Sequence, residues 1–519
     1  MGLLKGSSMA TPLVATPART IAIAGLVLST AAMSPGNGLA PATAKLLDRS
    51  PAAASAGTPS AETGRYILSA KRTAKIPAFA RKYDLPCSAC HTVWPELNNF
   101  GQVFKDNGYQ LKTGKDSPIT QSPTYFPIAF RTTPNYHIET TTNQLVDGPS
   151  GVCPSANSAD CTTKTITQQG FDLSGVDVLM LGTLYKNVTF GLVPTLDPVE
   201  GTIGIESAFI RFDNISNSSW LNFKFGKFEL DNMLSEKRIT TLSNNGGFYQ
   251  SYHFNPVGDV NTFGLGDNQL GMELLGHDRN SYMRYSLAVL STSDGTPGLP
   301  SGSGADVFLT LQKAWQTGLN LEKIGAYALF GQAPTTGPTS GGTPIPGAAT
   351  GNVSFTRVGL VGSLFLANAH LELIPLWMYG MDNVALTPAY GAVVPTQNPE
   401  WNAFLLEAHY IVNPQLLFEG RYEAIRMSQQ ADPASPSTQG NIDAFTLGMR
   451  MYVFMFSRDG LALHVEYANS KTIGAYPMSG DGAPPIYPVG SIMEPLELPN
   501  LYTTPITSSS FFIGLDFAF

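Results

Sequence analysis

The feature that most constrains this chain is a pattern of alternation that repeats from residue 126 to the C-terminus. Segments of roughly ten residues place apolar side chains at every second position, as strands do when one side faces lipid and the other a polar interior. We therefore predict an all-β fold, a transmembrane antiparallel β-barrel of about sixteen strands. The predicted strands are 126–139, 172–185, 187–196, 203–213, 219–230, 268–278, 280–291, 304–316, 320–331, 353–366, 369–380, 401–412, 414–427, 441–456, 460–469 and 508–519.

The connections between the predicted strands alternate in length. Short turns at one end and long loops at the other are typical of an outer-membrane barrel, and a soluble β-sandwich does not sort its connections in this way. Segment 197–202 is short where a long loop is expected, so the strand count could change by two. The short connections are 186–187, 214–218, 278–279, 317–319, 367–368, 413 and 457–459.

The last predicted strand places Phe511, Ile513, Leu515, Phe517 and Phe519 on one face and resembles a barrel-assembly signal. In an open sheet this apolar edge would be an aggregation hazard, whereas closure of a barrel removes the edge. Charged residues make up only 13% of the chain, and beyond the N-terminal region no apolar run is long enough for a membrane helix. The net charge of −8 argues against a nucleic-acid partner.

The N-terminus has the features of a secretory signal peptide. Lys5 and Arg19 precede an apolar stretch at 21–32, and Ala42-Thr43-Ala44 offers a cleavage site. A single anchoring helix is the alternative, but the apolar stretch is too short to cross a bilayer. We predict a signal peptide at 1–44, a flexible linker at 45–66, a cysteine-containing segment at 67–124 and the barrel at 125–519.

Within segment 67–124, Cys87-Ser88-Ala89-Cys90-His91 forms a CxxCH motif. In this motif the two thiols can attach to the vinyl groups of a haem while the adjacent histidine binds the iron. A thioredoxin-like CxxC is the alternative, but it should lie beside a βαβ pattern, and none surrounds this motif. We predict a monohaem cytochrome c segment with one covalent haem c, in which Cys87 and Cys90 form the thioethers and His91 is the proximal axial iron ligand.

The other two cysteines, Cys153 and Cys161, lie in a stretch rich in Gly, Ser, Asn and Thr and have no histidine beside them. An exported protein reaches an oxidising compartment, where such a pair can form a disulfide. We predict that this disulfide pins a loop and has no catalytic role.

The residues around the motif resemble a known family. They are Ile76-Pro77-Ala78-Phe79-Ala80-Arg81, then the CxxCH motif, then Pro95-x-Leu97 and Phe104-Lys105-x-x-Gly108-Tyr109. They resemble the fused monohaem cytochrome c-porin family of outer membranes, whose best-known members oxidise extracellular ferrous iron. The resemblance covers about residues 75–110 and implies a haem segment joined to a porin-like barrel, with Fe(II) as the electron donor.

The haem segment lacks an obvious sixth iron ligand, because neither methionine nor histidine occurs between Thr92 and Tyr136. Alternation places several histidines on the inward face of the barrel, each two or four residues from a glutamate. We therefore expect His370 or His409 to be the sixth ligand, with His277, His464 and Met378 as weaker candidates. The inward pairs are His370 with Glu372, Glu407 with His409, Glu273 with His277, and His464 with Glu466.

These inward pairs also allow other roles. A histidine near a glutamate is often part of a hydrogen-bonded lumen network, and such a pair can also hold a metal ion, as could His137 and Glu139 near the outer mouth. Further charges predicted to face inward are ordinary barrel lining or partners of the haem propionates. They are Arg211, Lys224, Arg284, Arg421, Glu419 and Glu423.

An even strand count places both ends of the barrel at the periplasmic side, with the haem segment at that mouth and plugging the lumen. The expected function is electron transfer across the bacterial outer membrane, from extracellular Fe(II) or another external donor to a periplasmic cytochrome or other carrier. This would make the protein an electron carrier or an iron:cytochrome oxidoreductase. The alternatives are a diffusion porin with a haem plug or sensor, and outward electron transfer to an external acceptor.

Overall fold

The computed structural model describes residues 78–83, 85–111, 116, 128–147, 161–196, 203–243, 245–256, 259, 261–298, 304–317, 321–340, 343–346, 351–387, 395–455, 460–473 and 505–518. These residues belong to one compact unit, Ala74–Phe519. The proposed signal peptide at 1–44 and linker at 45–66 lie outside the described residues. Within the described part of the chain, none of the helices has the length and hydrophobicity needed to cross a bilayer.

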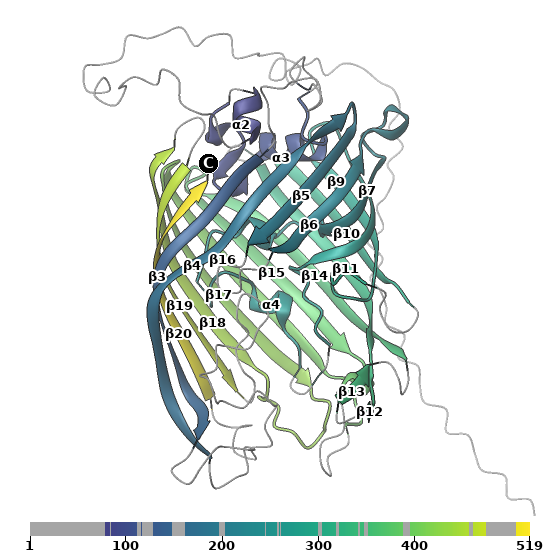
Figure 1. The fold of residues 1–519 in the computed structure, drawn as a ribbon, viewed down its shortest axis with the longest axis vertical. Helices are drawn as coiled ribbons and strands as arrows, with labels where there is room; N and C mark the ends of the chain where they lie inside the picture. The colour runs from purple at the N-terminus through teal and green to yellow at the C-terminus, as the bar shows by residue number, and fades with distance from the viewer. Residues whose placement is uncertain are drawn as a thin grey trace, which may run out of the picture. The chain divides into compact units, whose positions relative to one another are not determined.

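Sixteen antiparallel strands form a closed barrel (Figure 1), in which each strand pairs with the next along the chain and the last pairs with the first. Closure joins Phe512 to His137 in register. The strands are β3 (Ile128–Asp147), β4 (Cys161–Tyr185), β5 (Val188–Leu196), β6 (Ile203–Phe212), β7 (Asn222–Glu229), β8 (Asn268–His277), β9 (Met283–Leu290), β10 (Asp306–Gln316), β11 (Leu321–Pro334), β14 (Asn352–Leu366), β15 (Leu371–Asp382), β16 (Glu400–Asn413), β17 (Leu416–Gln429), β18 (Ile442–Met455), β19 (Gly460–Ile473) and β20 (Pro505–Ala518).

The predicted fold class and strand count are confirmed, and each predicted strand overlaps one strand of the barrel. The hairpin in doubt at 197–202 is correct, since β5 and β6 pair from Val188↔Phe212 to Leu196↔Ile203. A small hairpin of β12 (Thr336–Ser340) and β13 (Thr343–Pro346) lies in a long connection and was not predicted. Its sequence is rich in Thr, Gly and Pro and has no apolar alternation.

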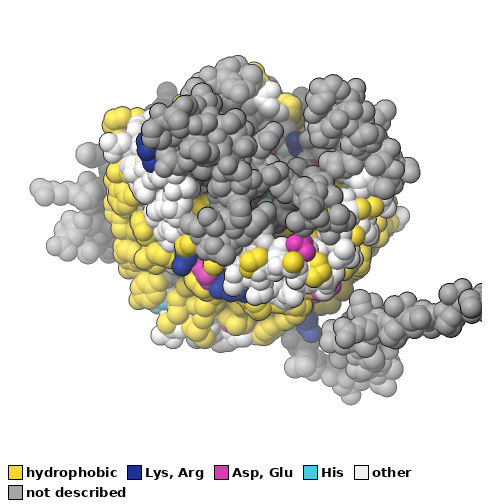
Figure 2. All heavy atoms as spheres, turned by 90° about the horizontal axis from the view of Figure 1, so that it is seen from below, with side chains coloured by type: hydrophobic (Ala, Val, Ile, Leu, Met, Phe, Trp, Pro, Cys, Tyr) yellow, Lys and Arg dark blue, Asp and Glu magenta, His cyan; other side chains and the backbone are white. Residues whose placement is uncertain are grey.

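The outer wall of the barrel is apolar. On β16, Phe404 and Leu406 are each 49% exposed, whereas Trp401, Ala403 and Leu405 on the other face are buried. Hydrophobic side chains extend around the wall in Figure 2. A closed barrel with such an exterior satisfies its backbone hydrogen bonds internally and presents apolar side chains to lipid, as a membrane barrel must.

The lumen is filled, and much of the filling comes from the connection between β7 and β8. Its described residues within 230–267 fold inward and include η4 (Glu236–Arg238) and α4 (Gln250–His253), which lies inside the barrel in Figure 1. The ring centroids of Phe254 and Trp401 lie 5.1 Å apart, and those of Phe263 and Phe355 lie 5.2 Å apart. This connection, which we call the inward loop, was expected to be an ordinary external loop.

Inward charges of the wall bind the backbone of the inward loop. The Leu242 N–H donates to Glu466 Oε2 at 2.7 Å, and the Ser251 N–H donates to Glu423 Oε2 at 3.1 Å. Arg421 donates to the Gly246 carbonyl. The inward direction predicted for these charges is confirmed, as it is for Arg211, Lys224, Arg284 and Glu419, all of which are buried.

The N-terminal segment consists of α2 (Ala78–Tyr83), η2 (Cys87–Ala89), β1 (His91–Val93), β2 (Glu96–Leu97) and α3 (Asn99–Asp106). It lies at the end of the barrel where the short turns are found (Figure 1), and β1 and β2 pair as a hairpin. The Asn98 side chain caps α3 by accepting the Gly101 N–H at 2.9 Å, which satisfies one of the unpaired donors at a helix start.

Candidate functional site

The CxxCH motif is held in a tight turn that begins after Pro86. Within this turn the Cys90 N–H donates to the Cys87 carbonyl at 3.1 Å. The Asn98 backbone N–H donates to the Cys90 carbonyl at 3.0 Å, and the Asn98 side chain donates to the Ala89 carbonyl at 3.1 Å. The same asparagine therefore starts α3 and orients the motif.

Gly101 allows α3 to pack directly on this turn. A Cβ atom at this position would lie 2.1 Å from the Cys90 carbonyl oxygen, which no real contact permits. The positions of both cysteines thus depend on a residue without a side chain eleven residues after the second.

The His91 ring is oriented by two backbone carbonyls. Its Nδ1 lies 3.1 Å from the carbonyl oxygens of both Pro95 and Glu96, and because a carbonyl can only accept, Nδ1 carries the hydrogen. Burial lowers the pKa of His91 to about 4, so the ring is neutral at physiological pH. A neutral imidazole whose Nδ1 is fixed by a carbonyl presents the Nε2 lone pair, which is the usual arrangement of a metal-ligating histidine.

Cys87, Cys90 and His91 line one cavity of about 600 Å³ inside the barrel. This volume falls within the range of roughly 300–1,000 Å³ typical of ligand pockets. We call it the large cavity. Its walls are mainly apolar and aromatic and come from both the segment and the barrel, including Phe79, Leu85, Trp94, Leu97, Phe104, Leu179, Leu181, Val193, Phe209, Phe228, Ile239 and Leu242.

Charged groups also border the large cavity. Arg131, Lys237 and Arg238 supply positive charge, and each pairs with a carboxylate of the barrel wall. Two thiols, a neutral imidazole, an apolar enclosure and cations at its border form a set that can hold a haem c, whose macrocycle is apolar and whose two propionates are anionic.

The Cys90 thiol does not have the character of a redox thiolate. Burial raises its pKa to about 11, and the neighbouring Cys87 adds to the rise. Reactive CxxC motifs depend instead on a lowered pKa. This difference argues against the thioredoxin-like alternative.

The structure places the proposed sixth ligands away from the motif. Among the described residues that line the large cavity, none is His370, His409, His277, His464 or Met378. The prediction that His370 faces the lumen is wrong: it is exposed in the turn before β15, and its Nδ1 lies 2.6 Å from the Ile411 carbonyl. Strand alternation does not extend into a turn, so it could not place this side chain.

The other four candidates do face inward but are engaged elsewhere. His277 Nδ1 lies 2.8 Å from the Asp278 carbonyl, and His464 Nε2 lies 2.7 Å from Glu466 Oε2. Met378 is 1% exposed and belongs to the hydrophobic core of the lumen. His409 contacts the N-terminal segment, but at Glu96, where its Nδ1 lies 3.2 Å from Oε2.

The segment is fixed to the barrel by a buried ion-pair network. The Asp106 carboxylate accepts from Arg284 Nε at 2.8 Å, and Asp231 of the inward loop accepts from the same guanidinium at 2.7 Å. Arg211 donates to the carbonyls of Lys105 and Asp106 at the end of α3. One arginine of the wall thereby joins the segment to the inward loop.

Aromatic residues and one glycine complete this attachment. Phe104 and Tyr109 pack with Phe79, and the guanidinium groups of Arg131 and Arg450 lie 5.1 and 5.3 Å from the centroid of the Trp94 ring. Gly108 has a φ of +68°, and a Cβ there would lie 2.1 Å from Asp213 Oδ2. The sequence motif Phe104-Lys105-x-x-Gly108-Tyr109 therefore contains the residues that end α3 against the wall.

His253 of the inward loop was missed by the sequence reasoning. Its Nε2 lies 2.8 Å from Glu236 Oε2, and Glu236 lines the large cavity. Burial alone would disfavour the charged ring, but Glu236 and the nearby carboxylates of Asp267 and Asp294 raise the pKa of His253 to about 9. The strand pattern gave no signal for it, because it lies in a connection without alternation.

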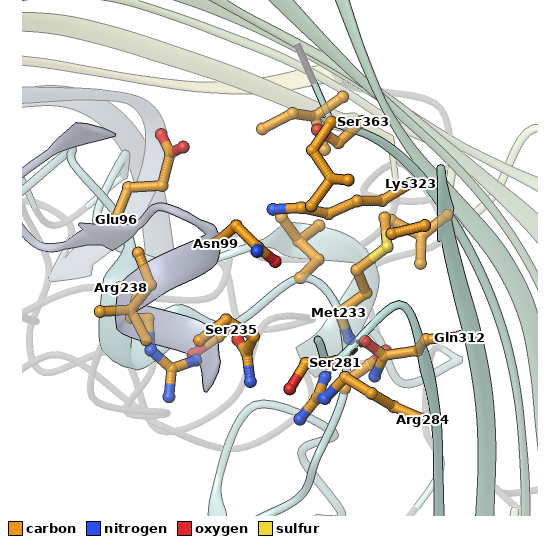
Figure 3. A pocket seen from close by; sticks show the side chains of 18 of the residues that line it. Glu96, Asn99, Met233, Ser235, Arg238, Ser281, Arg284, Gln312, Lys323 and Ser363 are labelled. Carbon is orange, nitrogen blue, oxygen red and sulfur yellow. Dashed lines mark hydrogen bonds between the residues drawn. The ribbon is translucent and has the colours of Figure 1, made fainter. Parts of the chain in front are cut away.

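A second cavity, of about 110 Å³, also borders the N-terminal segment; we call it the small cavity. Glu96, Glu372 and His409 converge on it, with ligand atoms within 4.8 Å of one another. Figure 3 shows Glu96 on one side of this cavity, with Lys323 and Ser363 of the barrel wall on the other. Glu419, His464 and Glu466 form another such group.

His137 and Glu139 lie near the middle of β3 rather than at its outer end, so their predicted place near a barrel mouth is wrong. Cys153 lies outside the described residues, as does the side chain of Cys161, and their disulfide stays a prediction.

No family model and no curated protein matches the chain. Among solved structures it is similar to OmpT, an outer membrane protein of Vibrio cholerae, with 11% identity, 75% of this chain and 99% of that chain covered, and a TM-score of 0.40. It is also similar to an anion-selective porin from Comamonas acidovorans, with 10% identity, 75% and 99% covered, and a TM-score of 0.44. The assignment of a barrel rests on the strand pairing within the chain itself.

Proposed function

We propose that this protein carries electrons across the bacterial outer membrane through one haem c held inside its barrel. The observation that supports this most is that Cys87, Cys90 and His91 line a single, mainly apolar cavity bounded by the N-terminal segment and the barrel. A haem held there would lie against mainly apolar walls, and its potential would depend on burial and on the His91 ligand.

Each group of the chain has a defined task in this proposal. Cys87 and Cys90 supply the sulfur atoms for covalent attachment, and His91 supplies Nε2 to the iron while Pro95 and Glu96 orient its ring. Trp94, which contacts two arginines, forms part of the cavity wall. When bound, the haem would supply one-electron redox chemistry at the short-turn end of the barrel.

The donor we favour is extracellular Fe(II), which the resemblance of residues 75–110 implies. Overall, one Fe(II) loses one electron to become Fe(III), and a periplasmic cytochrome or other one-electron carrier gains it, without proton transfer or bond cleavage. The short-turn end of the barrel, where the N-terminal segment lies, faces the periplasm in this orientation.

A diffusion porin with a haem plug is the alternative supported by the barrel architecture alone. The inward loop and the N-terminal segment argue against free diffusion, because both fill the lumen and are held by buried ion pairs and an aromatic core. Conductance in a planar bilayer separates the two proposals: porin-like ion flow through the intact protein would favour the porin.

The test is anaerobic addition of Fe(II) to the purified, oxidised protein while the haem absorption bands are recorded. We expect reduction of the bands by Fe(II) and re-oxidation by a periplasmic cytochrome. A Cys87→Ala/Cys90→Ala variant should carry no covalent haem on a denaturing gel, whereas Cys153→Ala/Cys161→Ala should retain it. Full covalent haem in the first variant, or a midpoint potential too negative for Fe(II) to reduce the haem, would overturn the proposal.

A further inference from the structure

We propose that Glu96, Glu372 and His409 bind a divalent metal ion at the small cavity. This inference rests on the function proposed above, in which the small cavity is the lumenal site that binds Fe(II) before its oxidation. Glu96 comes from the N-terminal segment, and Glu372 and His409 come from the neighbouring strands β15 and β16, where Glu372 and His409 are paired in register. The site exists only when the segment is seated in the barrel.

The three donors are close enough to share one ion. His409 Nδ1 lies 3.2 Å from Glu96 Oε2 and 3.9 Å from Glu372 Oε2. Two carboxylates and one imidazole are a donor set that suits Fe(II), Mn(II) and Zn(II). Water from the cavity would complete the coordination.

A buried Glu372 oxygen without a hydrogen-bond donor supports a bound cation at this point. Glu372 is 2% exposed, and its Oε2 is buried without a hydrogen-bond donor. The other oxygen, Oε1, accepts from the Ser363 hydroxyl at 2.5 Å, which fixes the direction of the carboxylate. A buried carboxylate oxygen without a partner carries a large desolvation cost, and a bound cation would offset it.

The residues behind the donors are arranged as they are around metal-ligating histidines. His409 Nε2 lies 2.7 Å from Glu407 Oε1, which leaves Nδ1 directed toward Glu96 and Glu372. Arg421 lies 3.5 Å from the other Glu407 oxygen. A carboxylate that holds the second ring nitrogen fixes the tautomer and strengthens the imidazole as a ligand.

The space in the cavity also fits a small cation. The cavity of about 110 Å³ has room for roughly three to four water molecules at about 30 Å³ each. Three carboxylates, those of Glu96, Glu372 and Glu407, lie around His409. The lining of the cavity as a whole also holds Asp231 and the cations Lys105, Arg238, Arg284, Lys313 and Lys323, so the donor atoms, and not an excess of negative charge, support the ion.

The site is joined to the haem motif by one residue. The Glu96 carboxylate is a proposed metal ligand, and the Glu96 carbonyl accepts the His91 Nδ1–H at 3.1 Å. An ion at the small cavity therefore lies one side chain, a short piece of backbone and one hydrogen bond from the proximal histidine. A positive charge at the small cavity should shift the midpoint potential of a haem bound to His91.

The other cluster, Glu419, His464 and Glu466, is a weaker candidate. Both Glu466 oxygens already accept hydrogen bonds from the inward loop, at the Leu242 and Ser243 amides, and Thr240 donates to Glu419. None of these three residues lines the small or the large cavity. Their carboxylates serve to hold the inward loop.

The first experiment measures Mn²⁺ binding by electron paramagnetic resonance on the haem-loaded, detergent-purified protein. We expect one site that is weakened at least about tenfold in Glu372→Gln and in His409→Gln. Asp306→Asn is the matched control, since Asp306 is also a buried carboxylate and accepts the Gln332 N–H rather than contacting the cluster. Unchanged affinity in both test variants, or an equal loss in the control, would overturn the site. Retained haem bands and far-ultraviolet dichroism verify that each variant is folded.

The second experiment separates the site from the proposed function. Zn²⁺ binding should shift the haem midpoint potential upward in the parent protein and not in Glu372→Gln, and this readout requires no iron oxidation. The rate of haem reduction by Fe(II) should fall in both test variants. Metal binding without any reduction by Fe(II) would leave the site standing and overturn the function; equal reduction rates in parent and variants would overturn the role of the site in Fe(II) oxidation.

Discussion

Two cavities border the short β1–β2 hairpin, and their chemistry is opposite. The large cavity receives Cys87, Cys90 and His91 and has mainly apolar walls, whereas the small cavity receives Glu96 and is lined by carboxylates, cations and His409. Only four residues of sequence, Thr92 to Pro95, lie between His91 in the large cavity and Glu96 in the small one. A hairpin too short to have a core of its own can therefore present different chemistry on each side, because the barrel supplies the surroundings.

The same contrast holds for two histidines outside the barrel strands. His91 contacts backbone carbonyls, and burial lowers its pKa to about 4, whereas His253 contacts Glu236, and its pKa is raised to about 9. A buried histidine that donates to backbone carbonyls is neutral and can ligate a metal, whereas one that pairs with a carboxylate is protonated.

The largest effect on stability is expected for a substitution at Arg284, where the small cavity meets the ion-pair network. Arg284→Met removes the guanidinium that Asp106 and Asp231 share and leaves Asp106 with Gln102 and Asp231 with Lys105, at a cost of about 3–5 kcal/mol. We expect a marked fall in the melting temperature and new ion conductance as the segment loosens. Arg279→Met, in an exposed turn, is the control and should change neither. Equal stability of the two variants would show that the network does not hold the segment.

A smaller effect, dependent on pH, is expected at the border of the large cavity. His253 is charged in the folded protein up to about pH 9. Because its folded pKa is raised above the unfolded value of about 6.5, its stabilising contribution, up to roughly 3 kcal/mol, is complete below pH ~6.5 and is lost as pH rises through about 9. Melting temperatures across this window should fall in the parent protein and change less in His253→Gln. Parallel pH profiles would contradict the ion pair.

The smallest effect on stability is expected for Gly101→Ala, and this variant distinguishes the two cavities most directly. Gly101→Ala places a Cβ against the Cys90 carbonyl, and such overpacking costs typically about 1–3 kcal/mol. We expect reduced haem content with Mn²⁺ affinity unchanged, since Gly101 borders only the large cavity. A loss of both haem content and Mn²⁺ affinity would mean that the β1–β2 hairpin couples the two cavities.

The barrel could be predicted from the sequence because alternation is local: each strand shows its two faces within ten residues or so. The CxxCH motif could be recognised for the same reason, and its haem stays a prediction. The inward loop could not, because its direction depends on Glu423 and Glu466, which lie far along the chain from the backbone they bind. Glu96 gave no signal either, since its partners His409 and Glu372 come from strands that closure of the barrel brings to it.

The filled lumen also constrains the order of assembly. The motif cysteines face a cavity whose walls come from β4, β5, β6 and β7 as well as from the inward loop. An attachment enzyme must hold both the haem and the Cys87–His91 turn, and in the finished barrel both cysteines of this turn are only partly exposed. In the proposed haem-carrying protein, we therefore expect the cofactor to be joined to the N-terminal segment before the barrel closes around it, so that a finished barrel without haem would take up the cofactor more slowly.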